Sequence, residues 1–235
     1  MAKMCLAWRG KAARLMMLFL ICVPASAQVP ETVVNVELLL ALDTSASVSR
    51  QEFELQLQGI AQAFRDPDVI EAVENLRPRG VAVGVMQWGG PGESRVILPF
   101  THILSAQDAK AFGFLVGRSY RFIGATATSI VTAIEVGVAL IESNAFDGER
   151  RVIDISGDGK DNSGLSLPEA RAIADRARVV VNGLAIEADE PALGAYYRDN
   201  VITGPDAFVE TASGFDDFAR AMAEKLVREL RPLGS

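Results

Sequence analysis

The chain has 235 residues, of which 49% are hydrophobic, 23% charged and 7% aromatic, and its formal net charge is −7. This composition is typical of a globular protein and excludes a fibrous repeat or a disordered chain. The acidic balance argues against nucleic acid and anionic lipid as partners, because both bind through clustered Lys and Arg.

The N-terminal segment has the pattern of a secretory signal. Four basic residues precede an apolar run at 15–23, which is too short to span a bilayer. The small residues at 25–27 form the pattern that a signal peptidase cleaves. We therefore expect residues 1–27 to be a signal peptide and residues 28–235 to be a single domain in the periplasm.

Removal of this signal would change the charge and the cysteine content. The mature chain would carry 19 basic and 30 acidic residues, a net charge of −11. Both Cys5 and Cys22 lie in the signal, so neither a disulfide nor thiolate chemistry is expected in the mature protein. No later apolar segment is long enough to cross a membrane.

The rest of the chain predicts strands that alternate with helices. Nearly continuous apolar runs and β-branched runs predict strands at 33–42, 81–88, 95–100, 151–156, 179–186 and 207–210. Capping residues followed by apolar residues at helical spacing predict helices that begin near 49, 69, 105, 128, 168 and 215.

This order of elements predicts an α/β fold with a doubly wound, mostly parallel sheet flanked by helices. The run Gly89-Gly90-Pro91-Gly92 joins the second and third strands, so we expect one antiparallel hairpin at the edge. Asn182-Gly183 would ordinarily indicate a turn, but inside an apolar run Gly183 indicates close backbone packing. Ligands of such sheets bind at the carboxyl ends of the strands.

The sharpest local motif is Asp43-Thr44-Ser45-Ala46-Ser47, directly after the first strand. Asp43, Ser45 and Ser47 offer one carboxylate and two hydroxyls at alternate positions, which are hard oxygen ligands suited to Mg²⁺ or Mn²⁺. The motif alone is weak, because Ser and Asp at such a turn are often simple helix caps.

Two later loops also offer oxygen ligands. Thr126 lies in a loop that contains Gly124 and precedes a helix, and Asp158 follows the strand that ends near Ser156. Because these loops come from strand ends, we expect them to lie near the first motif at one edge of the sheet.

With these three loops the sequence resembles the von Willebrand factor A (vWA) superfamily over 33–230. The metal-ion-dependent adhesion site (MIDAS) of that superfamily consists of DxSxS, a loop Thr and a later Asp before Gly. In detail the chain looks similar to a bacterial branch of secreted vWA-like proteins without an established activity. The segments that carry this likeness are the SGDG loop, the GPDAFV stretch and the KLVREL end.

The resemblance implies a non-enzymatic binding domain that uses Mg²⁺ or Mn²⁺. Ser45, Ser47 and Thr126 would contact the metal through hydroxyls, and Asp43 and Asp158 would hold it directly or through waters. The partner would be a protein, a peptide or an envelope component that presents an Asp or Glu carboxylate to the metal. The superfamily usually has Thr or Ser directly before Asp-Gly, whereas this chain has Gly157.

Two other functions stay open at this stage. Asp43 together with the run Gly157-Asp158-Gly159-Lys160-Asp161-Asn162 also resembles a Mg²⁺-dependent phosphatase of the haloacid-dehalogenase type, with Asp43 as the nucleophile. However, Ser45 stands where the general acid of that family lies. The third possibility is a metal-free interaction module in which the polar loops only cap helices.

Three other polar features of the sequence could have a catalytic or a structural role. A serine hydrolase is disfavoured, because His102 is the only histidine and no GxSxG motif is present. Asp154 lies within an apolar strand and therefore needs a cation or backbone donors. We expect Asp161 and Asn162 to be turn residues.

Overall fold

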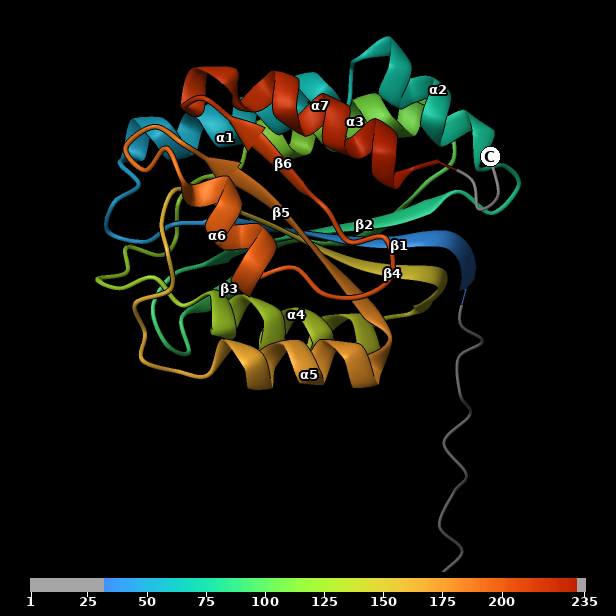
Figure 1. Cartoon of the computed structure of the whole chain (residues 1–235). Helices are drawn as coiled ribbons and strands as arrows, with labels where there is room; N and C mark the ends of the chain where they lie inside the picture. The colour runs from blue at the N-terminus through green and yellow to red at the C-terminus, as the bar shows by residue number, and fades with distance from the viewer. Residues whose placement is uncertain (1–31, 232–235) are drawn as a thin grey trace, which may run out of the picture.

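The computed structural model of the protein describes residues 32–231. They form a six-stranded sheet with the order β3-β2-β1-β4-β5-β6 and helices on both faces, as Figure 1 shows. The predicted fold class is therefore confirmed. The signal peptide predicted for residues 1–27 lies outside the described residues and stays a prediction.

The strands are β1 (Thr32–Asp43), β2 (Val81–Trp88), β3 (Ser94–Ile103), β4 (Phe146–Gly157), β5 (Val179–Ile186) and β6 (Val209–Ala212). The central strand β1 pairs in parallel with β2 on one side and with β4 on the other. Strands β5 and β6 continue the parallel part. Strand β3 pairs antiparallel with β2, which confirms the predicted edge hairpin.

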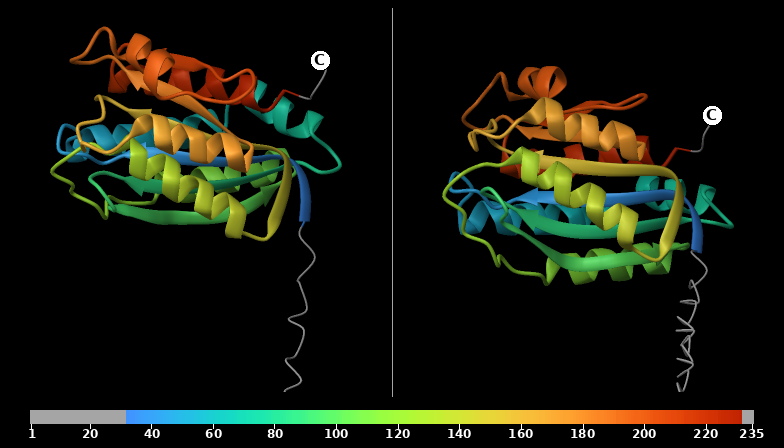
Figure 2. Two further views of the ribbon diagram at one scale, coloured as in Figure 1. Left: turned by 60° about the horizontal axis from the view of Figure 1, so that its bottom comes forward. Right: turned by 90° about the horizontal axis from the view of Figure 1, so that it is seen from below.

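The helices are α1 (Arg50–Ala63), α2 (Pro67–Asn75), α3 (Ala106–Gly117), α4 (Ile130–Ser143), α5 (Leu167–Ala177), α6 (Leu193–Asn200) and α7 (Phe218–Glu229). Helices α1, α2, α3 and α7 lie on one face of the sheet, and α4 and α5 lie on the other (Figures 1 and 2). None of the helices in residues 32–231 is long and apolar enough to cross a membrane.

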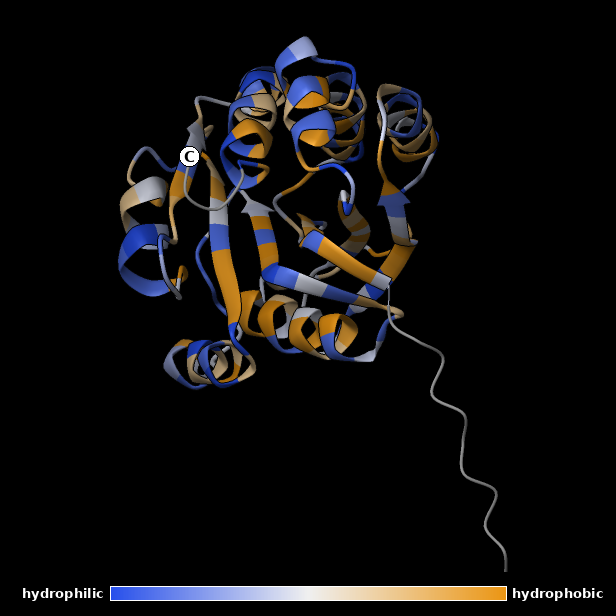
Figure 3. Cartoon of the chain, turned by 90° about the vertical axis from the view of Figure 1, so that its right-hand side faces the viewer, coloured by the Kyte–Doolittle hydropathy of each residue, from blue (hydrophilic) through white to orange (hydrophobic). Residues whose placement is uncertain are grey.

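Each face of the sheet has its own hydrophobic core. Alternate residues of β1 point to opposite faces, so Leu38 and Leu40 pack against α1 and α7 while Leu39 and Ala41 pack against α4. Figure 3 shows apolar residues along the strands and on the inner sides of the helices. Strands that are buried on both faces explain the nearly continuous apolar runs in the sequence.

The helix after β1 begins where its capping residues predict. The Ser49 side chain accepts a hydrogen bond from the Glu52 N–H at 3.2 Å, and the Glu52 carboxylate accepts one from the Ser49 N–H at 2.7 Å. These two bonds form the predicted capping box and satisfy two backbone donors. The cap fixes where α1 begins, so the loop between β1 and α1 runs over 44–49.

The structure differs from the sequence-based expectations at a few elements. Strand β4 begins five residues before the predicted start, because its charged first half pairs with β1. Helix α4 begins at Ile130 with Ser129 as its cap, two residues after the predicted start. Strand β6 is shifted by two residues. Helix α6 was not predicted at all, and its N-terminus has no side-chain cap.

Candidate metal site

Three loops meet at the edge of the sheet where the parallel strands end. The first follows β1 over 44–49, the second precedes α4 over 118–129, and the third follows β4 over 158–166. Hydrogen bonds connect the first loop to each of the other two. These contacts bring the three loops together at one edge. The second loop, however, joins α3 to α4 and does not follow a strand end, which differs from the sequence-based expectation.

The side chains of the first and third loops form a chain of hydrogen bonds. Ser45 Oγ lies 3.2 Å from Ser47 Oγ, and the Ser47 hydroxyl donates to Asp158 Oδ1 at 2.7 Å. The Ser45 N–H donates to Asp43 Oδ1 at 2.7 Å. Four of the five residues predicted as ligands therefore lie in one connected cluster, although Ser47 and Asp158 are 111 positions apart.

Asp43 is the buried end of this cluster. Burial raises the pKa of its carboxyl from the usual 3.8 to about 7. The charge of Asp158 acts in the same direction, and hydrogen bonds from Ser45 act against both. Within residues 32–231, Asp43 Oδ2 has no hydrogen-bond partner. A carboxylate oxygen in this position is stabilised by a positive charge beside it.

Asp158 lies at the opening of the site. Burial raises the pKa of its carboxyl above the usual value, and the hydrogen bond from Ser47 opposes this shift. The charges of Glu52 and Asp189 raise the pKa further. Negative charge therefore accumulates at this edge, which favours a cation over an anion as its ligand.

Arg121 supports the first loop, and sequence reasoning missed it. Its guanidinium donates to the carbonyl oxygens of Thr44 at 2.7 Å and Ser45 at 3.1 Å, and it also bonds Val48 O. Its Nε donates to Ile123 O at 2.7 Å. One side chain thus holds the DxSxS loop against the loop before α4. A lone Arg in a loop gives no local pattern that would have identified this role.

Thr126, the fifth predicted ligand, lies in the second loop with its side chain exposed. No hydrogen bond of its hydroxyl is found in the described part of the chain, so it is not connected to the cluster. Its neighbour Thr128 is buried and forms a reciprocal pair with Asn162, through Thr128 N to Asn162 Oδ1 at 2.8 Å and Asn162 N to Thr128 O at 3.0 Å. This pair joins the loop of Thr126 to the loop of Asp158.

Asp161 and Asn162, which are predicted to be turn residues, connect the third loop to its neighbours through hydrogen bonds. Asp161 Oδ2 accepts from Val131 N in the first turn of α4 at 3.3 Å, and Asp161 Oδ1 accepts from the Ser163 hydroxyl at 2.7 Å. With the Asn162 pair, these bonds fix the third loop against α4. The position of Asp158 therefore depends on α4 as well as on β4.

The donor set of this cluster is chemically suited to a hard dication. Two carboxylates supply the charge and two hydroxyls supply neutral oxygens, which is the ligand chemistry of Mg²⁺ and Mn²⁺. Within residues 32–231 no group of three or more His, Cys, Asp or Glu side chains could hold a metal ion. A site built from acidic residues and histidines alone is thus absent from this range, and a metal here would depend on hydroxyls.

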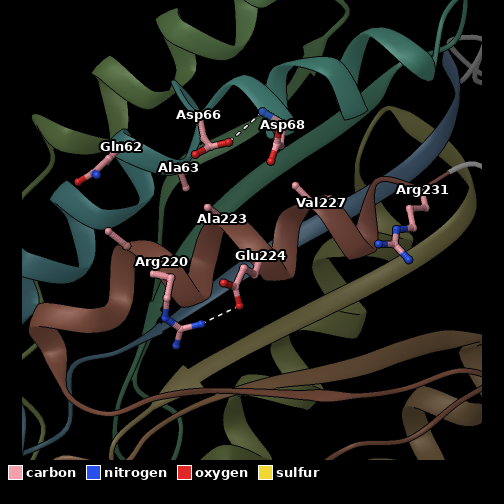
Figure 4. A pocket seen from close by; sticks show the side chains of 10 residues that line it. Gln62, Ala63, Asp66, Asp68, Arg220, Ala223, Glu224, Val227 and Arg231 are labelled. Carbon is pink, nitrogen blue, oxygen red and sulfur yellow. Dashed lines mark hydrogen bonds and ion pairs between the residues drawn. The ribbon is translucent and has the colours of Figure 1, made fainter.

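A hollow of about 520 Å³ lies elsewhere in the molecule, between α1, α2 and α7. Figure 4 shows Asp66 and Asp68 on one wall and Arg220 and Glu224 on the other. This hollow is open and is lined by both acidic and basic side chains. None of the five predicted metal ligands contributes to it. We therefore regard the carboxyl edge of the sheet, not this hollow, as the candidate site.

Comparisons with known proteins identify the family and the fold. The family described as "Protein of unknown function (DUF1194)" matches residues 33–233. No curated protein matches the sequence. Solved structures with the same fold are vWA domains, in agreement with the resemblance found in the sequence.

Three of these structures share the fold of this chain at low sequence identity. Proximal thread matrix protein 1 from the mussel byssus, solved with a zinc-occupied MIDAS motif, has a TM-score of 0.55 and 14% identity over 87% of this chain and 48% of its own. The pilus adhesin SpaC from Lactobacillus rhamnosus GG has a TM-score of 0.58 and 15% identity over 84% of this chain and 31% of its own. A von Willebrand factor type A protein from Catenulispora acidiphila has a TM-score of 0.55 and 16% identity over 84% of this chain and 43% of its own. The chain spans less than half of each of these proteins.

Proposed function

Because the chain belongs to the DUF1194 family and has the fold of vWA domains, we propose that it is a secreted binding domain that depends on a divalent metal. Asp43, Ser45, Ser47 and Asp158 would hold the ion, and Thr126 would join them from the second loop. The observation that carries this proposal is the buried, unpartnered Oδ2 of Asp43 at the end of a cluster of hydroxyl and carboxylate oxygens.

The chain's own residues prepare this site before any ion arrives. Arg121 and the Thr128–Asn162 pair hold the three loops together, so little conformational entropy is lost when the ligands close on a cation. Asp43 and Asp158 would balance the charge of a dication, and the two serine hydroxyls are neutral ligands that leave the ion Lewis-acidic. A bound Mg²⁺ or Mn²⁺ would therefore supply a Lewis-acidic point that takes a carboxylate oxygen from a partner.

The partner that suits this chemistry is a protein or peptide with an accessible Asp or Glu. The site itself is acidic, so without a metal it would repel such a group. A pilus adhesin and a pilus tip protein are among the structures that share the fold, which supports binding rather than catalysis. We place the protein in the periplasm, where the predicted signal peptide would deliver it.

The test is a calorimetric titration of the purified protein, freed of metal with a chelator, with Mg²⁺ and Mn²⁺. We expect saturable binding of one ion, weakened at least tenfold by Ser45→Ala and by Asp158→Ala. Ser143→Ala is the matched control, because Ser143 is exposed at the C-terminal end of α4, bonds Ala139 O and lies outside the cluster. Binding that is absent, or unchanged in the first two variants, would favour a metal-free interaction module.

The phosphatase alternative is tested with an aryl phosphate in the presence of Mg²⁺. We expect no hydrolysis above the uncatalysed rate, since Ser45, which bonds Ser47, cannot act as a general acid near neutral pH. Turnover that is lost in Asp43→Asn would instead show that the protein is an enzyme.

A further inference from the structure

Tyr197 in α6 lies across two glycines of the neighbouring strands β4 and β5. A Cβ on Gly183 would lie 2.6 Å from Tyr197 Cδ1, and a Cβ on Gly157 would lie 2.8 Å from Tyr197 Oη. Any side chain at either position would therefore displace the tyrosine. The missing side chains of these glycines make room for one ring, which reaches from the middle of β5 to the end of β4.

The hydroxyl of this ring ends beside the metal-site carboxylate. The same Cβ position on Gly157 lies 2.8 Å from Asp43 Oδ2, so one point is equally close to Oδ2 and to Tyr197 Oη. The Tyr197 side chain is fully buried. In the described part of the chain, neither the Tyr197 hydroxyl nor Asp43 Oδ2 has a hydrogen-bond partner.

The two unpartnered polar atoms, which both border the space beside Gly157, are chemically complementary. A phenol hydroxyl is a donor and a carboxylate oxygen is an acceptor, and each costs free energy if it stays buried without a partner. The neighbouring Tyr196 provides a contrast, because its hydroxyl already accepts a hydrogen bond from Asp161 N at 3.2 Å. The Tyr197 hydroxyl is thus available for Asp43.

We propose that Tyr197 is a positioning residue of the metal site: when the ion binds, the tyrosine hydroxyl donates to Asp43 Oδ2 and orients this carboxylate toward the loop that holds the ion. This inference rests on the proposed function. The tyrosine hydroxyl reaches, from α6, the space that a side chain at Gly157 would fill.

The experiment compares Tyr197→Phe with Tyr196→Phe, because each substitution removes one phenol hydroxyl and keeps the ring. We measure Mn²⁺ affinity by calorimetry and the melting temperature of the metal-free protein. Tyr197→Phe should weaken Mn²⁺ binding about tenfold or more, as outer-shell substitutions at metal sites do. Its melting temperature should not fall, since the hydroxyl has no partner to lose. Tyr196→Phe, which loses a bond to Asp161 N rather than a hydroxyl beside Asp43, should weaken Mn²⁺ binding less than Tyr197→Phe does.

A spectroscopic readout follows the tyrosine itself. The chain has three tyrosines, and a change in the hydrogen bonding of one of them alters its near-ultraviolet absorption. Addition of Mg²⁺ should give a tyrosine difference spectrum that Tyr197→Phe abolishes and Tyr196→Phe retains. If the unaltered protein binds Mn²⁺ and Tyr197→Phe binds it equally well, the positioning role is wrong while the proposed function stands. If the unaltered protein binds no Mn²⁺, both are wrong.

Discussion

Two buried aspartates on adjacent strands of the sheet have opposite surroundings. Asp43 at the end of β1 and Asp154 within β4 are both almost completely inaccessible to solvent, and burial raises the pKa of each carboxyl. Asp154 faces Lys225 of α7, whose Nζ lies 3.2 Å from Asp154 Oδ1 and 2.7 Å from Glu229 Oε1. Asp43 has no ion pair with any residue of 32–231.

The difference separates a carboxylate that has a permanent internal cation from one that is proposed to bind a metal ion. Asp154 lies under a helix where no solute can reach it, so the chain supplies a permanent cation from its own sequence. Asn182 completes that cluster by donating to Glu229 Oε1 at 2.9 Å. Asp43 lies beneath the three loops, and the nearby guanidinium of Arg121 donates to backbone carbonyls instead. Under the proposed function, an exchangeable ion would balance the charge of Asp43.

The largest effect that the comparison predicts is for Lys225→Met. This change would leave Asp154 and Glu229 buried without their shared cation, and breaking a buried ion pair from one side costs about 3–5 kcal/mol. We expect the free energy of unfolding, measured by urea denaturation, to fall by about this amount.

Lys110→Met in α3 is the matched control, because Lys110 is exposed and makes no ion pair in residues 32–231. Its effect should stay within about 0.5 kcal/mol. A loss below about 1 kcal/mol in Lys225→Met would show that the internal cation does not stabilise the two carboxylates.

The second-largest effect concerns the free energy of unfolding of the metal-free protein, which should depend on pH through Asp43. Its pKa in the folded protein is about 7 against the usual 3.8, so the folded state holds the proton more tightly. This contribution to stability is complete below the unfolded pKa and is lost as the pH rises through about 7. In a chelator, Asp43→Asn should therefore be more stable than the unaltered protein at about pH 8, by about 1–3 kcal/mol.

The difference between these two proteins should shrink at about pH 4, where Asp43 is protonated in the folded state. This difference is measured from the free energies of unfolding of the two proteins at both pH values, with chelator present. Excess Mg²⁺ should reverse the order at the higher pH by stabilising only the unaltered protein. An Asp43→Asn variant that is less stable than the unaltered protein at both pH values would contradict the view of Asp43 as an uncompensated charge.

The smallest effect is expected for Arg121→Gln, which tests whether the loops are held in place before metal binds. The change removes the bonds to Thr44, Ser45 and Val48 but no proposed ligand. Mn²⁺ affinity by calorimetry should fall about tenfold, because the DxSxS loop must then be ordered at the expense of binding.

Arg118→Gln serves as the comparison, since Arg118 is exposed and contacts only the Phe114 ring among the described aromatic residues. It should bind Mn²⁺ as the unaltered protein does. Equal affinities in the two variants would show that the loops need no support from Arg121.

Much of the fold could be predicted because its strands have a clear local pattern. The bounds of β2 and β5 match the predicted ranges, since each is a continuous apolar run with turn residues or a helix end on both sides. The sequence predicts that Asp154 faces a cation or backbone donors, and the structure supplies the cation, Lys225. The inference that Gly183 marks close packing is confirmed by Tyr197 Cδ1, which lies where a side chain at 183 would be.

Helix α6 shows why the rest could not be predicted. It is short, begins without a side-chain cap and buries only Leu193, Gly194 and Tyr197, so its apolar pattern is too sparse to stand out. Tyr196 and Tyr197 are adjacent in sequence, yet one hydroxyl bonds a backbone amide and the other has no partner beside Asp43. Only the packing of α6 on β5 separates these two roles.

By itself, the sequence determined the alternation of strands and helices, the capping of α1 and the identity of the oxygen-bearing loops, because each depends on residues within a few positions of one another. The tertiary structure decided which of these side chains meet. Ser47 and Asp158 come together through the pairing of β1 with β4, and Lys225 reaches Asp154 through the packing of α7 on the sheet. Such contacts join residues far apart in the chain, and they depend on strand order and helix placement that no local pattern encodes.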